Sequence, residues 1–179
     1  MTAIIIVIII RALVPFTILR WQLGGALLSM AVDAVDVILV DLIGLVTGES
    51  GTGFGNHYQL VDKTMDIYYL SFEAYVSLHW SNQLARNTSI ILFVYRIIGM
   101  VAFEITGIRR LLFIFPNLFE NFYLYYVVAA RFFPRYAVNT PRQLVIALVL
   151  LFIPKVGQEW LLHYQEAQPW NWLKSLFLR

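Results

Sequence analysis

Carboxylate side chains recur within the apolar stretches of this sequence, where a charge is costly and usually marks a functional group or a paired interior. Asp62, Asp66 and Glu73 fall within about 40° of one another on a helix that turns about 100° per residue. A stripe of carboxylates cannot face lipid. We therefore expect this stripe to face the interior of a helix bundle, a water-filled cavity or a partner protein.

Other apolar stretches also carry ionisable groups at helical spacing. Asp33 and Asp36 are neighbours at i and i+3 on one stretch. Lys155 and Glu159 share a stripe in the last stretch, with His163 at its edge. Besides Asp33, Asp36, Asp62 and Asp66, the predicted polar core consists of Asp41, Glu73, Arg96, Glu104, Glu120, Lys155, Glu159 and His163.

Acidic groups outnumber basic groups inside these stretches, where nine carboxylates stand against Arg11, Arg96 and Lys155. A buried carboxylate without a cationic partner must hold a proton or bind a metal ion or another cation. One interpretation is therefore a working site. The other is a structural ion-pair network, in which some acids lie in water at helix ends or pair with arginines beside the loops, such as Arg86.

The elements that must position these groups are transmembrane helices. Hydrophobic residues make up 60% of the 179 residues, against about 45–50% in soluble domains, and charged residues make up only 13%. Crossing a bilayer takes about 20 mostly apolar residues, and stretches of about that length recur along the chain. These stretches cover residues 3–19, 25–46, 58–80, 90–105, 111–133 and 140–163, and the fifth is broken at Pro116-Asn117.

The predicted fold is all-α, a polytopic bundle of five or six transmembrane helices that forms a single integral membrane domain over residues 1–179. The number is five or six because Arg11 and Pro15 interrupt the first stretch. That stretch is interpreted as retained, since its first charge follows the apolar run instead of preceding it. Residues 168–179 are predicted to form a C-terminal interfacial helix. The expected location is the cell membrane, with several crossings.

The spacing of four aspartates resembles part of the CDP-alcohol phosphatidyltransferase pattern. The matching residues are Asp33 and Asp36 on one helix, and Asp62 and Asp66 at the start of the next, in the segment YQLVDKTMD. Members of that family are six-helix membrane enzymes in which two aspartate pairs hold divalent metal ions, while an alcohol displaces the nucleotide of a CDP-linked lipid. The resemblance therefore implies a divalent-cation site on these aspartates. The family's glycine and Ala-Arg positions after the second aspartate are absent from this chain.

Composition excludes several other classes of function. The chain has no cysteine, which excludes disulfides, thiolate metal sites and cysteine nucleophiles. A net charge of +2 and the absence of any Lys/Arg run argue against nucleic acid as a partner. No complete catalytic motif is visible, which favours a non-catalytic subunit of a larger membrane complex whose partners are the lipid bilayer and other membrane subunits. A metal-dependent phospholipid-synthesis enzyme of the CDP-alcohol type is the alternative, and proton or cation translocation is the third hypothesis.

Overall fold

The structure is a computed structural model, and it describes residues 2–47, 58–108 and 110–160. Every regular element in these ranges is a helix, which confirms the predicted all-α class. The contacts group the chain into two compact units, Met1–Ser81 and Asn82–Arg179. The single integral membrane domain stays a prediction. The predicted interfacial helix over residues 168–179 lies outside the described residues.

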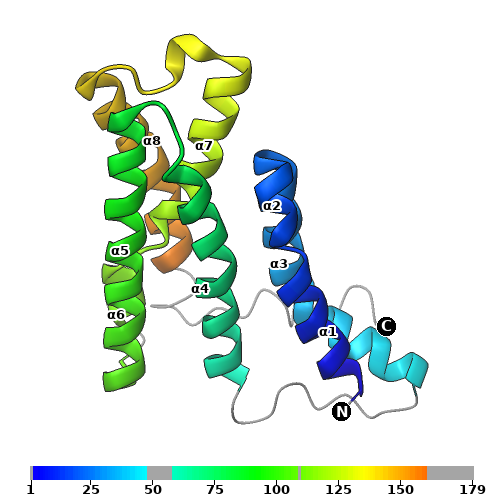
Figure 1. Cartoon of the computed structure of the whole chain (residues 1–179). Helices are drawn as coiled ribbons and strands as arrows, with labels where there is room; N and C mark the ends of the chain where they lie inside the picture. Colours follow the sequence, from blue (N-terminus) through cyan, green and yellow to red (C-terminus); the bar gives the residue numbers. More distant parts are fainter. Residues whose placement is uncertain (1, 48–57, 109, 161–179) are drawn as a thin grey trace. The chain divides into compact units, whose positions relative to one another are not determined.

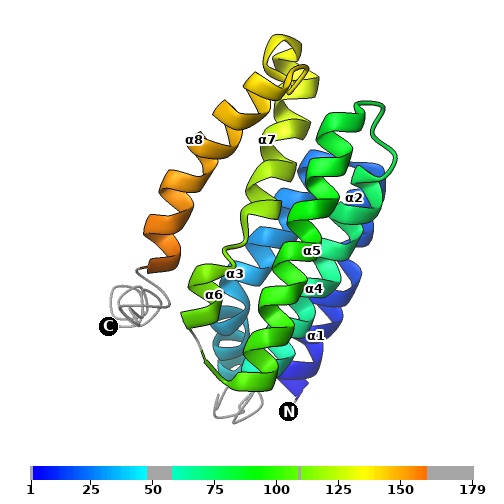
Figure 2. The same cartoon turned by 90° about the vertical axis from the view of Figure 1, so that its left-hand side faces the viewer.

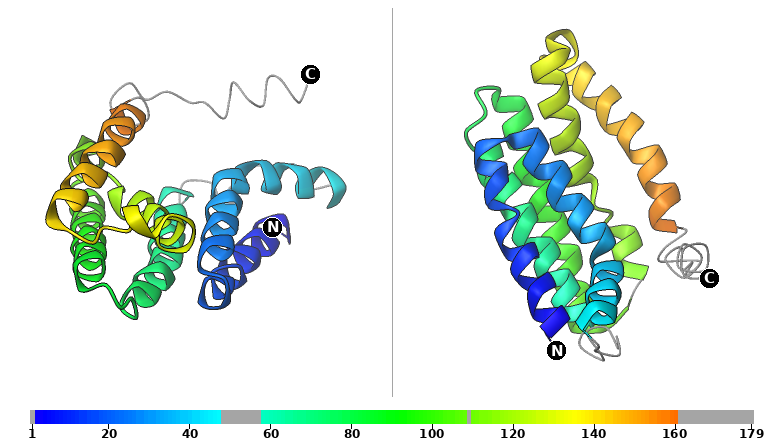
Figure 3. Two further views of the ribbon diagram at one scale, coloured as in Figure 1. Left: turned by 90° about the horizontal axis from the view of Figure 1, so that it is seen from above. Right: turned by 90° about the vertical axis from the view of Figure 1, so that its right-hand side faces the viewer.

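The first unit contains α1 (Thr2–Leu13), α2 (Phe16–Arg20), α3 (Gln22–Thr47) and α4 (Tyr58–Ser77). The helices α1 and α2 follow one another along α3, as the blue and cyan ribbons of Figure 1 and both views of Figure 3 show. Helix α4 also contacts α1, α2 and α3. The first predicted stretch thus forms two helices, and the next two form one helix each.

Pro15 causes the break between α1 and α2, because a proline ring lacks the amide hydrogen that would continue the helix and clashes with the preceding turn. The side chains nearby supply hydrogen bonds to backbone carbonyls at the break. Thr17 Oγ1 donates to the carbonyl of Val14 at 2.6 Å, and the Tyr68 hydroxyl of α4 donates to the carbonyl of Ala12 at 3.0 Å. The tyrosine thereby links the end of α1 to α4.

Gly25 lets α3 begin in close contact with α2. A Cβ atom at this position would lie 2.4 Å from the backbone nitrogen of Ile18, a distance that real Cβ atoms essentially never show. At Gly24 the nearest atom to such a Cβ would be Trp21 Cβ at 3.8 Å, an ordinary contact. Only the second glycine of the pair is therefore required by the packing.

The second unit contains α5 (Gln83–Thr106), α6 (Arg110–Ile114), α7 (Leu118–Phe132), the short 3-10 helix η2 (Pro134–Tyr136) and α8 (Pro141–Glu159). Helix α5 packs against α6 and α7, and α7 also packs against α8. Figure 2 shows α5, α7 and α8 as successive long helices, with α7 and α8 joined through a turn at one end.

A side-chain cap and a glycine fix the two ends of α5. Asn82 accepts a hydrogen bond from the amide of Ala85 at 3.1 Å, which satisfies one of the free donors of the first turn. Gly107 ends the helix in the left-handed conformation, with a φ of 67°, a conformation that glycine adopts at little cost. The helix begins seven residues before the predicted Ile90, so this predicted start was wrong: polar residues after Asn82 form the first two turns instead of a loop.

Two segments of the described chain are long and apolar enough to cross a membrane: Gln83–Thr106 and Arg110–Phe132. The first is α5, and the second consists of α6 and α7 together with the break between them. The other predicted stretches also form helices, but they do not meet the same test of length and composition. The predicted total of five or six crossings therefore stays a prediction.

Candidate functional site

Arg11 of α1 lies at the centre of a group of charges in the first unit. Its side chain is only 3% exposed, and its guanidinium donates hydrogen bonds to Asp33 and Asp36 of α3. Its Nη2 atom lies 3.5 Å from Oδ1 of Asp66 in α4, and the other Asp66 oxygen lies 3.3 Å from Nζ of Lys63. We call Arg11, Asp33, Asp36, Lys63 and Asp66 the Arg11 cluster. Their ion pairs link α1, α3 and α4.

The geometry of the Arg11 cluster follows from the shapes of its side chains. Asp33 and Asp36 are three residues apart, so both carboxylates project from one face of α3. One accepts from Nη2 of Arg11 and the other from Nη1, so both arms of the rigid guanidinium fork are used. A lysine ammonium is a single point charge and cannot reproduce this pattern.

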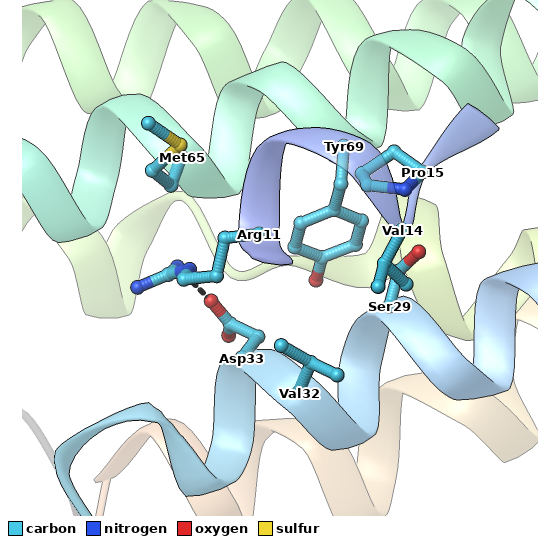
Figure 4. Close-up of a pocket in the computed structure, with 8 residues that line it drawn as sticks. All are labelled: Arg11, Val14, Pro15, Ser29, Val32, Asp33, Met65 and Tyr69. Carbon is cyan, nitrogen blue, oxygen red and sulfur yellow. Dashed lines mark hydrogen bonds and ion pairs between the residues drawn. The ribbon is translucent and has the colours of Figure 1, made fainter. Parts of the chain in front are cut away.

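A small pocket adjoins the Arg11 cluster (Figure 4). It measures about 200 Å³ including its open mouth. In Figure 4 the Arg11–Asp33 pair lies to one side of the Tyr69 ring, and Ser29 lies to the other. Ser29 is 4% exposed, and its Oγ has no hydrogen-bond partner within the described structure. The complete lining is Arg11, Val14, Pro15, Ser29, Val32, Asp33, Met65 and Tyr69.

Three of the four aspartates of the predicted metal site, Asp33, Asp36 and Asp66, meet at the Arg11 cluster. The side chain of the fourth, Asp62, lies outside the described part of the chain. The cation between the three carboxylates in this structure is the guanidinium of Arg11. Among the described side chains, no three of Asp, Glu and His are arranged as ligands of one metal ion. The metal site stays a prediction.

The remaining predicted core residues fall into three groups. Glu73, Arg96, Glu120 and Lys155 are buried. Glu104, which lies in the last turn of α5 three residues before Gly107, is exposed, contrary to the prediction. The side chains of Asp41 and Glu159, together with all of His163, lie outside the described residues.

Arg96 stabilises the break between α6 and α7. The helix ends before Pro116, so the last carbonyls of this turn have no helical partners. Arg96 Nη1 donates to the carbonyl of Phe115 at 3.1 Å, and the Tyr95 hydroxyl donates to the carbonyl of Ile114 at 2.6 Å. Two adjacent side chains of α5 thereby replace missing backbone donors, which is how broken helices are tolerated in membranes.

Glu120 belongs to the cap at the start of α7. The side chain of Asn117 accepts from the amide of Glu120 at 3.5 Å, and its Nδ2 donates to Oε2 of Glu120 at 3.0 Å. Both residues are buried. A carboxylate in the first turn also faces the positive end of the helix dipole. The described contacts therefore give Glu120 a structural role.

Sequence reasoning did not identify Ser29 or the connection between Arg11 and the three aspartates. The available signal was Arg11 itself, the one cation inside the first apolar stretch. No family model, curated protein or solved structure matches the chain, so the comparisons do not identify a function for the Arg11 cluster. The resemblance to CDP-alcohol phosphatidyltransferases therefore stays a prediction.

Proposed function

We propose that this chain is a multi-pass integral membrane protein that acts as a non-catalytic subunit of a larger membrane assembly. The observation that carries the proposal is that the two buried arginines, Arg11 and Arg96, contact carboxylates or the backbone. Arg11 contacts carboxylates of two other helices, and Arg96 contacts a carbonyl at a helix break. Charges in such positions stabilise a helix bundle and do not require a substrate.

Exposed apolar faces support the membrane part of the proposal. On α5, exposed residues recur at helical spacing and form one continuous stripe. A face of this kind is suited to contact with lipid or with a partner helix, and large patches are uncommon on soluble monomers. The stripe on α5 consists of Ile91, Val94, Tyr95, Ile98, Val101 and Ile105. A similar face on α8 consists of Val145, Ile146, Val149, Leu150, Phe152 and Ile153.

Helix lengths favour six crossings. A helix rises about 1.5 Å per residue, and the hydrocarbon core of a bilayer is about 30 Å thick. Helices α3, α4, α5 and α8 contain 26, 20, 24 and 19 residues. The segment Arg110–Phe132 contains 23 residues. The pair α1 and α2 together provides the sixth crossing.

Arginine distribution favours one orientation of the second unit. Four arginines lie where α5 begins, α7 ends and α8 begins: Arg86, Arg131, Arg135 and Arg142. The Asn82 side chain joins these termini, because its Nδ2 donates to the carbonyls of Ala137 and Val138. Loops rich in arginine and lysine remain on the cytoplasmic side of membranes. We therefore propose that this end of the second unit faces the cytoplasm, with Arg110 at the start of α6 on the opposite side.

A charge on the lipid-facing stripe tests the membrane part. Ile98 is exposed near the middle of α5, and Ile98→Asp is expected to abolish membrane insertion, because aspartate at a helix centre costs about 2.5–3.5 kcal/mol. Gln83→Asp, at the exposed start of the same helix, is the matched control and inserts normally. The measurement is the fraction of α5, Gln83–Thr106, that inserts as a test helix in a membrane-insertion reporter, because the other proposed crossings would hold the full chain in the membrane. Equal, low insertion of the wild-type segment and both variants would contradict the proposed crossing.

Native electrophoresis tests the subunit part. The tagged full chain is extracted from its own membranes in a mild detergent and separated without denaturation. The chain is expected to migrate with other membrane proteins in fixed proportion, well above its own 20.7 kDa. Recovery as a lone, monodisperse chain that remains folded would contradict the subunit proposal while leaving the membrane part intact.

Asp33, Asp36 and Asp66 lie together around Arg11, which favours a second candidate function. This candidate is the metal-dependent lipid enzyme that the aspartate spacing implies. Carboxylate oxygens are the ligands that Mg²⁺ and Mn²⁺ prefer. Electron paramagnetic resonance of the purified chain titrated with Mn²⁺ distinguishes the two candidates. The subunit proposal predicts no stoichiometric binding, whereas binding that Asp36→Asn abolishes would favour the enzyme.

A further inference from the structure

We propose that the second unit binds the phosphate headgroups of anionic phospholipids through four arginines, which we call the arginine end. These are Arg86 in the first turn of α5, Arg131 in the last turn of α7, Arg135 in η2 and Arg142 in the first turn of α8. Arg86 is half-buried and the other three are exposed. This role rests on the proposed function, since the chain must span a bilayer for the arginine end to meet such lipids.

The helices that form the arginine end carry no acid near it. Residues 82–103 and 121–158 contain no Asp or Glu. The acids of these helices lie at their opposite ends: Glu104 in the last turn of α5, Glu120 in the first turn of α7 and Glu159 at the end of α8. The salt bridges between described residues all lie in the first unit. The arginine end is therefore a positive surface that an anionic ligand can neutralise.

Hydrogen bonds hold the turn between α7 and α8, which closes one end of the unit in Figure 2. Gln143 Nε2 donates to the carbonyl of Arg135 at 2.9 Å, and Gln143 Oε1 accepts from the amide of Asn139 at 2.8 Å. Asn139 Nδ2 also donates to the carbonyl of Pro134 at 3.0 Å. The backbone around Arg135 is thus held before any ligand arrives, which lowers the entropy lost on binding.

Val138 shows that contacts with other residues determine the shape of this turn. Its φ of 57° lies in the left-handed region, which is unfavourable for a β-branched residue. Residues keep such conformations only where the surrounding structure imposes them, and they are common at binding sites. The Val138 side chain is fully buried, and its carbonyl and that of Ala137 accept from Nδ2 of Asn82 at 3.1 and 3.2 Å. The buried valine anchors the turn while the residues before it are exposed.

Exposed aromatic rings beside the arginines favour a lipid over a soluble anion. Phe132, Phe133 and Tyr136 are 56%, 58% and 60% exposed. The guanidinium carbon of Arg131 lies 5.7 Å from the centroid of the Phe132 ring. Aromatic rings are enriched at the headgroup level of membranes, where an apolar and a polar environment meet. A free phosphate ion would contact the arginines and leave these rings in water, whereas a phospholipid covers both.

Guanidinium chemistry suits the lipid phosphate. The planar fork of an arginine can donate two parallel hydrogen bonds to phosphate oxygens. Clusters of four or more basic residues beside a membrane helix attract the anionic lipids of the cytoplasmic leaflet, and each basic residue raises the affinity about fivefold. The proposed orientation of the second unit places the arginine end at that leaflet.

Electron spin resonance of the full chain in phosphatidylcholine vesicles tests the proposal. Trace spin-labelled phosphatidylglycerol or spin-labelled phosphatidylcholine is added, and the fraction of each lipid immobilised at the protein is compared. The wild-type chain is expected to prefer phosphatidylglycerol by at least about fivefold at low salt. The preference should fall sharply in about 1 M salt, which screens charges beyond about 3 Å. Equal immobilisation of the two lipids by the wild type would overturn the proposal without any variant.

Matched variants assign the preference to the arginine end. Arg135→Gln combined with Arg142→Gln should reduce it to less than about twofold, whereas the corresponding pair of lysine substitutions keeps the charge and should retain most of it. Arg131→Gln tests the same surface if the double variant does not fold. Arg110→Gln removes one exposed arginine at the start of α6 and should leave the preference unchanged. An equal loss in Arg110→Gln would overturn the assignment to the arginine end.

The same vesicles distinguish failure of this proposal from failure of the proposed function. A chain that floats with phosphatidylcholine vesicles but shows no lipid preference would refute the lipid site and leave the membrane part intact. A chain that does not enter the vesicles would refute both. Inorganic phosphate that abolishes the preference, where sodium chloride of equal ionic strength does not, would identify a free-anion site instead. Release of a partner protein by the double glutamine variant, with no lipid preference in the wild type, would identify an acidic protein as the ligand.

Discussion

The guanidinium of Arg11 in α1 is hydrogen-bonded to the buried carboxylate of Asp36 in α3, 25 residues further along the chain. Both side chains are only 3% exposed. Removing one member of a buried pair leaves the other charge uncompensated, at a typical cost of about 3–5 kcal/mol. Arg11→Gln is therefore expected to destabilise the first unit by about that amount. The measurement is unfolding of the detergent-solubilised chain followed by circular dichroism.

Arg20→Gln is the matched control for Arg11→Gln, because it makes the same chemical change at an exposed arginine at the end of α2. Surface substitutions usually change stability by less than about 0.5 kcal/mol. Equal effects of the two substitutions would show that Arg11 has no special role in holding α1 to α3.

The two adjacent glycines at the start of α3 should respond differently to alanine. Gly25→Ala places a Cβ 2.4 Å from the backbone of Ile18, so α2 and α3 must move apart. Overpacking of this kind costs about 1–3 kcal/mol. Gly24→Ala meets only an ordinary contact and should be neutral or stabilising by up to about 1 kcal/mol, since alanine favours helices. The reverse order in thermal unfolding would contradict the observed α2–α3 packing.

Hydropathy predicted the helices because each apolar stretch has about the length of a bilayer crossing, and α3 begins within three residues of the predicted Gly25. The break at Pro116 was also predictable, since proline cannot continue a helix. The start of α5 was not, because the polar run after Asn82 has the composition of a loop. The structure shows that it is helical: the amide of Ala85 donates to the Asn82 side chain, and the amide of Arg86 donates to the Asn82 carbonyl.

The candidate site was predictable only in part. Helical spacing alone places Asp33 and Asp36 on one face of α3. Their pairing with Arg11 depends on how α1 lies along α3, which the turn around Pro15 and the contact at Gly25 determine. Such contacts between helices have no local signature in the sequence. The sequence therefore indicated more carboxylates than basic groups in the apolar stretches. It did not indicate that Asp33 and Asp36 would share Arg11.

Asn82, at the start of α5, should contribute more to the free energy of unfolding than Asn87 in the first turns of the same helix. It caps α5 and donates to the carbonyls of Ala137 and Val138, so Asn82→Ala loses a cap worth about 1 kcal/mol and two further hydrogen bonds of about 1 kcal/mol each. Asn87→Ala alters an exposed residue of α5 and should have little effect. Similar unfolding midpoints for the two variants would contradict this role of Asn82.

Cysteine accessibility can establish the topology of the second unit cleanly, because the natural chain contains no cysteine. Gln83→Cys and Arg135→Cys lie at the end that Asn82 holds together, whereas Ile108→Cys lies beyond the other end of the 24-residue α5. At about 1.5 Å per residue, α5 is long enough to separate these positions by a full bilayer. An impermeant maleimide should therefore label Ile108→Cys from the outside of intact cells. The other two should react only after the membrane is opened. Labelling of all three from one side would show that α5 does not cross the membrane.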